Sequence, residues 1–189
     1  KFATSPSAGT LVAMPKRFCR KHIYEKNTYY IFIFSFFCSL ILYAISCFTG
    51  TIILKLQEQK KLDVSDKINR YLPDYPNGDI ISIEHLLTHT SGIFNYTDDR
   101  IFMETQAKQP INREIMLKLL QDKSLNFTPG TNFEYSNSNY LVLGYIIEKV
   151  TGKSYEKVAN EFIFKPLKMN STGFNFKKLS EVNKAFGYE

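Results

Sequence analysis

The sequence predicts a mainly helical domain that follows a long apolar run, and two observations lead to this prediction. Apolar residues recur at helical spacing in several segments after residue 48. Residues 29–48 contain no charged side chain, and serines are their only polar interruptions. At 189 residues, 44% of them hydrophobic, the chain is large enough to bury a core. These features indicate a globular protein and exclude a disordered one.

The N-terminal part divides into a basic leader, residues 1–27, and an apolar run, residues 28–47. A membrane-spanning helix needs about 20 apolar residues, and this run is long enough. Basic residues gather in the leader at Lys16, Arg17, Arg20, Lys21 and Lys26. By the positive-inside rule they keep the N-terminus in the cytoplasm. The run therefore predicts a transmembrane helix that anchors a periplasmic or extracellular domain to the membrane.

Local signals then place the first helices of the domain. Residues 48–62 form a predicted helix whose inward face consists of Ile52, Ile53, Leu56 and Leu62. A turn at residues 63–66 follows this helix. Residues 83–89 and 112–121 form two more predicted helices, and we expect residues 95–110 to be mobile.

The most informative segment lies between Asn126 and Gly152. Pro129-Gly130 predicts a turn, and an extended stretch with Phe133 and Tyr135 follows it. Apolar residues then repeat at helical spacing until Gly152, at Leu141, Leu143, Ile146, Ile147 and Val150. Tyr135 and Asn137 therefore lie on a short connector before a helix. Such a connector can direct a phenol and an amide into one cleft, as general-base catalysis and amide recognition require.

Two other patterns allow a functional and a structural interpretation. Ser154-Tyr-Glu-Lys157 has the spacing of a serine nucleophile and its lysine, but Ser154 also suits the N-cap of an amphipathic helix, which we favour. His85 and His89 are four residues apart on a predicted helix, a spacing that can ligate zinc. No third ligand follows at a suitable distance, so we favour a structural helix and expect no metal.

Charge and cysteine content add little about partners. The net charge of +6 is modest, and the lysines are spread without the aromatic or glycine patterns of a nucleic-acid-binding module. We therefore expect no nucleic-acid partner. The three cysteines do not indicate a disulfide framework.

Three segments together resemble the class C β-lactamase and penicillin-binding-protein family of serine hydrolases, which includes esterases and D-amino-acid peptidases. The first runs from Phe48 to Ile68, and the second is Ile83-Glu-His-Leu-Leu-Thr-His-Thr-Ser-Gly-Ile. The third runs from Pro129 to Gly152 and is followed by residues 164–174. The resemblance implies an α+β fold of the β-lactamase/DD-peptidase type. Residues 48–189 would then be a partial domain, mostly its helical lobe, with most sheet strands belonging to missing ends.

The resemblance also implies a mechanism and site residues. In such enzymes a serine attacks a lactam, peptide or ester carbonyl, a lysine and a tyrosine share proton transfer, and backbone N–H groups bind the oxyanion. Tyr135 would be the base or proton relay, and Asn137 would bind the amide of a small-molecule or peptide substrate. No metal or organic cofactor is implied.

Departures from the family pattern point to an inactive chain. Tyr43 stands where the nucleophilic serine is expected, and Ser46 stands where the lysine is expected. A phenol is a poor acyl acceptor in this role, and a hydroxyl cannot replace the amine. No Lys-Thr-Gly or His-Thr-Gly element is present, and Lys1 is not an initiator methionine, so we interpret the chain as a fragment or a defective gene product.

The functional prediction therefore keeps two alternatives. One is a serine hydrolase relative that is inactive as given, and the other is a non-catalytic, membrane-associated binding or scaffold protein. Whether the chain is an enzyme stays open at this point. The apolar run also has two explanations, because it ends where the family-like sequence begins. It is either a true membrane anchor or the product of a shifted reading frame.

Overall fold

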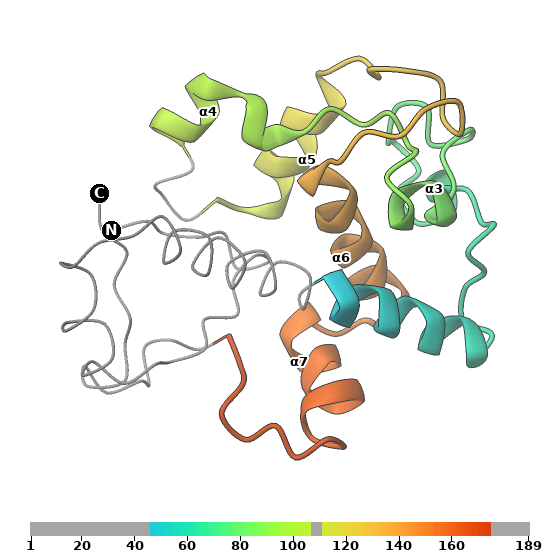
Figure 1. Ribbon diagram of the computed structural model, residues 1–189, viewed down its shortest axis with the longest axis vertical. Coiled ribbons are helices and arrows are strands. Elements are labelled where there is room, and N and C mark those ends of the chain that lie inside the picture. The colour runs from blue at the N-terminus through green and yellow to red at the C-terminus, as the bar shows by residue number, and fades with distance from the viewer. Residues whose placement is uncertain (1–45, 107–110, 175–189) are drawn as a thin grey trace, which may run out of the picture.

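The computed structural model describes residues 46–106 and 111–174, and every regular element in these residues is a helix (Figure 1). The first helix covers residues 46–58. It is followed by η1 (Ile68–Arg70), α3 (Ile83–Leu87), η2 (Tyr96–Asp98), α4 (Arg100–Thr105), α5 (Arg113–Gln121), α6 (Asn137–Thr151), α7 (Tyr155–Ala159) and the π-helical turn η3 (Asn160–Phe164).

Helix α6 is the centre of this arrangement. It packs against α3, η2 and α7, and Figure 1 shows it between α3 and the segment that leads to α5. Its middle is buried on all sides, since Val142, Leu143, Ile146 and Ile147 are fully inaccessible to solvent. A helix that is apolar all round belongs in a core. Gly152 ends it in the left-handed conformation, with φ of 65°, so the predicted helix and its terminus are confirmed.

The helix of residues 46–58 completes the core beside α6. Ile52, Ile53 and Leu56 are fully buried, and the Phe48 ring packs edge-on against Phe164 with centroids 5.5 Å apart. The predicted inward face is therefore correct. The helix ends at residue 58, earlier than predicted, because Lys60 adopts a left-handed conformation with φ of 55°.

The predicted fold class is wrong for the described residues. An α+β fold requires paired strands. In the described residues the only β-type pairing is an isolated antiparallel bridge between Lys67 and Ser82. Residues 126–131 consist mainly of bends and turns and residues 132–136 form no regular element, and single backbone hydrogen bonds from this segment to residues 89–92 replace a ladder.

The predicted transmembrane helix is also not supported. No helix among the described residues is long and apolar enough to cross a membrane. Residues 28–45 of the apolar run lie outside the described residues, as does the basic leader. Residues 46–47 begin the helix of residues 46–58, whose apolar side packs in the protein core.

Two loop predictions change as well. Part of the stretch expected to be mobile contains η2 and α4, and the Asp99 side chain caps α4 by accepting a hydrogen bond from the Phe102 N–H at 3.0 Å. Helix α5 agrees with its prediction. Asn112 is its N-cap, and its side chain accepts from the Ile115 N–H at 2.9 Å.

Candidate active site

The structure brings Tyr135 and Asn137 together at the start of α6. The Tyr135 hydroxyl, on a half-exposed side chain, donates a hydrogen bond to Asn137 Oδ1 at 3.1 Å. Asn137 is the first residue of α6, and Ser136 between them is buried. Tyr135 therefore presents its phenol to solvent from a connector whose next residue is fixed in the protein. We call residues 134–137 the connector.

Asn95 caps the N-terminus of α6 from a distant loop. Its Oδ1 accepts from the Asn137 backbone N–H at 3.0 Å and from Asn137 Nδ2 at 3.3 Å. Ser136, at the N-cap position, makes no side-chain capping bond. The first backbone donors of a helix need such partners, and a residue 42 positions away supplies one here.

The side-chain amide of Asn137 is already hydrogen-bonded at both ends. Its carbonyl accepts from Tyr135, while its Nδ2 donates to Thr97 Oγ1 at 3.2 Å as well as to Asn95. The structure thus joins the predicted pair into one network. A substrate amide would have to replace at least one of these partners in order to bind Asn137.

The turn of residues 89–92 holds the connector and the loop before it through backbone hydrogen bonds. His89 O accepts from the Glu134 N–H at 3.0 Å, Thr90 O from the Gly130 N–H at 2.8 Å, and Gly92 O from the Asn126 N–H at 2.8 Å. The second and third segments of the family resemblance are therefore one structural unit.

Gly92 shows how close this contact is. Its φ is +74°, and a Cβ atom at this position would lie 2.2 Å from the carbonyl oxygen of Phe127. Only glycine combines this backbone conformation with such a close approach. Next to it, the buried Ser91 hydroxyl donates to Asn139 Oδ1 at 2.6 Å, which joins the turn to α6 through side chains as well.

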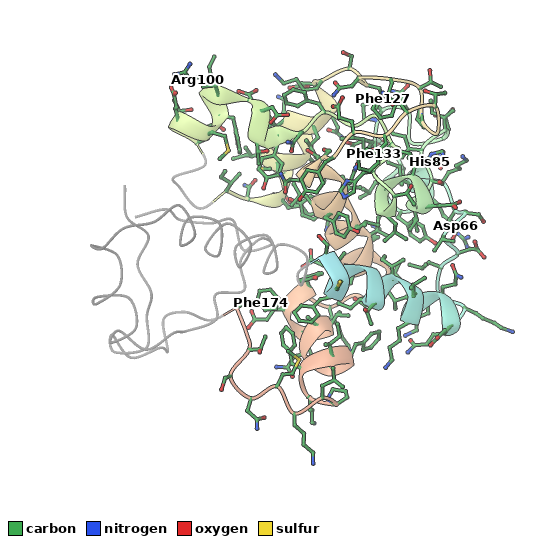
Figure 2. The ribbon with its side chains drawn as sticks, viewed as in Figure 1. Asp66, His85, Arg100, Phe127, Phe133 and Phe174 are labelled. Atoms are coloured by element: carbon green, nitrogen blue, oxygen red, sulfur yellow. The ribbon has the colours of Figure 1, made fainter. Side chains whose placement is uncertain are left out.

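His89 lies beneath the connector and is the residue that sequence reasoning missed as part of the site. Helix α3 ends at Leu87, and His89 is left-handed with φ of 57°. Its ring packs on Tyr135 at 4.6 Å and on Tyr140 at 5.2 Å between centroids, and the Phe133 ring meets it edge-on at 6.2 Å (Figure 2 shows Phe133 beside α3). The sequence predicts a structural helix over residues 83–89 that includes His89, whereas the observed helix ends at Leu87.

The zinc interpretation assumed that both histidines lie on one helix, and this premise is wrong. His85 is inside α3, where its Nδ1 accepts from the Ser82 N–H at 3.3 Å in a capping box. His89 lies beyond the helix. Among the described residues, no group of three His, Cys, Asp or Glu side chains is arranged to hold a metal ion.

Ser154 is the N-cap of α7, which confirms the structural interpretation of the Ser154-Tyr-Glu-Lys157 pattern. Its Oγ accepts from the Lys157 N–H at 3.4 Å at the start of α7. Ser154 follows the C-terminal end of α6, whereas Tyr135 precedes the N-terminal end, and a helix of this length separates them by roughly 20 Å. Ser154 and Tyr135 therefore cannot act on one carbonyl.

Tyr140 of α6 packs on His89 beneath the connector. Burial raises the pKa of Tyr140, and the charges that Cys47 and Tyr135 carry when ionised raise it further. Ser46, the residue at the expected lysine position, directly precedes Cys47, while Tyr43 lies outside the described residues.

Comparisons with known proteins show the family of the chain. The family model described as Beta-lactamase matches residues 47–189. PbpX of Bacillus subtilis (strain 168) is 37% identical over 140 residues, which cover 74% of this chain and 34% of that protein. The chain thus spans about a third of the length of this relative.

Solved structures of penicillin-binding and amidohydrolase proteins also resemble this chain. The penicillin binding protein from Bacillus halodurans has a TM-score of 0.63 and 29% identity, over 72% of this chain and 42% of that chain. A D-stereospecific amidohydrolase from Streptomyces sp. has a TM-score of 0.59 and 33% identity, over 66% of this chain and 41% of that chain.

Proposed function

We propose a function on the premise that this chain belongs to the β-lactamase family of serine hydrolases, as its family match shows. In our proposal, Tyr135 and Asn137 form the proton-transfer and amide-binding half of an acyl-transfer site. The observation that carries it is the bonded pair on the connector, since Tyr135 Oη lies 3.1 Å from Asn137 Oδ1 and the phenol is half exposed. The substrates would be compounds with a lactam, D-amino-acid peptide or ester carbonyl.

The chain as given would bind such a substrate without becoming acylated. A tyrosine base needs a neighbouring nucleophile, and positions 43 and 46 carry tyrosine and serine instead of serine and lysine. Tyrosine at position 43 therefore removes the acyl acceptor, and serine at position 46 removes the amine that would take up a proton.

The substrate class has support from the structural relatives. One is named as a D-stereospecific amidohydrolase and another as a penicillin binding protein, and both names describe proteins that recognise compounds with an amide or lactam carbonyl. Asn137 offers an amide side chain for this purpose, since its Nδ2 can exchange a hydrogen bond to Thr97 for one to a substrate carbonyl.

Fluorescence anisotropy with a fluorescent penicillin tests the binding step. We expect the anisotropy to rise with protein concentration and to return to its starting value when unlabelled penicillin is added in excess. Tyr135→Phe and Asn137→Leu should each weaken binding about tenfold or more, because Tyr135→Phe removes one hydrogen bond from the half-site and Asn137→Leu removes the three that its side chain makes.

Asn170→Leu is the matched control, since Asn170 is an exposed asparagine in the loop after η3. Its affinity should equal that of the unmodified protein. Binding that is equally strong in all three variants would contradict the assigned site, and no anisotropy change at any concentration would contradict the function.

A further inference from the structure

His89 accepts two hydrogen bonds at one ring nitrogen. The Ser136 backbone N–H lies 3.3 Å from His89 Nδ1, and Asn139 Nδ2 lies 3.1 Å from the same atom. A backbone N–H can only donate, so Nδ1 must carry a lone pair and the ring proton must be on Nε2. Ser136 is part of the connector, so the bond reaches the residue between Tyr135 and Asn137.

The ring of His89 also supports Tyr135 directly. The two rings lie 4.6 Å apart at an angle of 40°, and Tyr140 packs on the imidazole at 5.2 Å. His89 itself is fixed by its own backbone, since its carbonyl accepts from the Glu134 N–H at 3.0 Å. One residue therefore contacts the connector through its carbonyl, its ring nitrogen and its ring face.

We propose that His89 is a positioning residue of the acyl-transfer half-site, which holds Tyr135 and Asn137 in place by accepting hydrogen bonds at Nδ1 from Ser136 and Asn139. It touches no substrate in this proposal and acts through the connector. Protonation of Nδ1 would turn the acceptor into a donor that faces two other donors, so the connector would lose its bond from Ser136 and α6 its bond from Asn139. The inference rests on the function proposed above.

The surroundings of His89 favour its neutral form. Burial lowers the pKa of His89 below its usual value of 6.5. The titratable groups on the elements packed around it are Tyr135 of the connector, Tyr140 of α6, Glu134, and His85 of α3. The Glu134 carboxylate is hydrogen-bonded to the Asn126 side chain, and His85 is engaged with Ser82.

The direction of the pH effect follows from this lowered pKa. Above about pH 6.5 the imidazole is neutral in both the folded and the unfolded chain, and Nδ1 holds the connector. As the pH falls below 6.5, the unfolded chain takes up the proton first, so the folded form loses stability. The connector is released as the pH passes through the lowered pKa of the folded state.

Two substitutions distinguish the effect of the hydrogen-bond acceptor at Nδ1 from the effect of the aromatic ring. His89→Asn places an amide oxygen on Cγ, where Nδ1 was, and asparagine tolerates the left-handed backbone. It keeps the acceptor and cannot be protonated. His89→Phe keeps an aromatic ring between Tyr135 and Tyr140 but leaves the Ser136 N–H without an acceptor. His85→Asn is the control, because His85 is a second partly buried histidine with a lowered pKa but bonds to Ser82 instead of the connector.

The test is an NMR titration of 15N-labelled protein from pH 8 to pH 5, which follows the His89 ring nitrogens and the Ser136 amide, combined with penicillin anisotropy at each pH. We expect His89 and Ser136 to shift with one common midpoint below 6.5, and penicillin affinity to fall with the same midpoint. His89→Asn should bind independently of pH in this range. His89→Phe should bind about tenfold more weakly at pH 8, and His85→Asn should behave like the unmodified protein.

The outcomes distinguish the inference from the function on which it rests. A Ser136 amide that does not follow His89, or an affinity that His89→Phe leaves unchanged, would overturn the positioning role. If penicillin does not bind at any pH, the proposed function fails, and the joint titration of His89 and Ser136 still decides whether His89 holds the connector. If His89→Phe does not fold, the titration of the unmodified protein gives the same decision.

Discussion

A serine-containing motif lies near each end of α6. The connector precedes its N-terminal end, and Ser154-Tyr-Glu-Lys157 follows its C-terminal end. Both look like catalytic motifs in the sequence, but their contacts differ. At the N-terminal end, the connector bonds to residues more than 40 positions away, namely His89 and Asn95. At the C-terminal end, the hydroxyl of Ser154 accepts a hydrogen bond from a residue only three positions away. A motif forms a site where distant segments fix its side chains, and spacing alone does not provide this.

Glycine substitutions should show the largest difference between the two ends. Gly92→Ala at the connector side combines φ of +74° with a Cβ only 2.2 Å from Phe127 O, so we expect a loss of about 3 kcal/mol or more in the free energy of unfolding. Gly152→Ala at the other end has φ of +65° with open space around it, and should cost about 1 kcal/mol. Urea denaturation of both variants measures the difference, and equal losses would show that the contact with Phe127 is not close.

Loss of a helix cap should also destabilise the protein more at the N-terminal end of α6 than at the C-terminal end, but by less than the glycine substitutions do. Asn95→Ala removes a buried cap that serves both the backbone and the side chain of Asn137, and we expect it to cost about 2 kcal/mol. Ser154→Ala removes an exposed local cap of α7 and should cost about 0.5 kcal/mol. Thermal unfolding followed by circular dichroism compares the two, and a larger loss from Ser154→Ala would reverse the comparison.

Two serines within the N-terminal end should respond in opposite directions. The Ser136 hydroxyl is buried and has no hydrogen-bond partner in the described part of the chain, so Ser136→Ala should stabilise the protein by about 1 kcal/mol. The equally buried Ser138 hydroxyl donates to Phe94 O at 2.6 Å and accepts from the Tyr96 N–H at 3.0 Å. Ser138→Ala should therefore destabilise it by about 1–2 kcal/mol. A destabilising Ser136→Ala would mean that its hydroxyl has a partner, such as a buried water.

Local signals made much of this architecture predictable from sequence. Helical spacing and Gly152 located α6, and Asn112 and Ser154 marked two helix starts, because periodicity and caps depend on residues within a few positions of one another. The connector itself was predicted for the same reason, since a Pro-Gly turn and a helix limit how far Tyr135 can move.

The long-range contacts could not be read from the sequence. Asn95 caps α6 from 42 positions away, and His89 meets Ser136 from 47 positions away, so no local pattern reveals either contact. His89 looked helical because it continues the spacing of α3, but its left-handed backbone places it under the connector instead. The α+β prediction failed for a similar reason, because pairing between strands depends on distant partners.

Denaturing gel electrophoresis after incubation with a fluorescent penicillin decides whether the chain forms an acyl-enzyme, because only a covalently acylated protein keeps the label. We expect the unmodified chain to bind the probe in solution but to give no labelled band, since positions 43 and 46 lack the serine and lysine of the family. A labelled band that disappears in Tyr135→Phe would contradict it, because the chain would then contain both a nucleophile and its base.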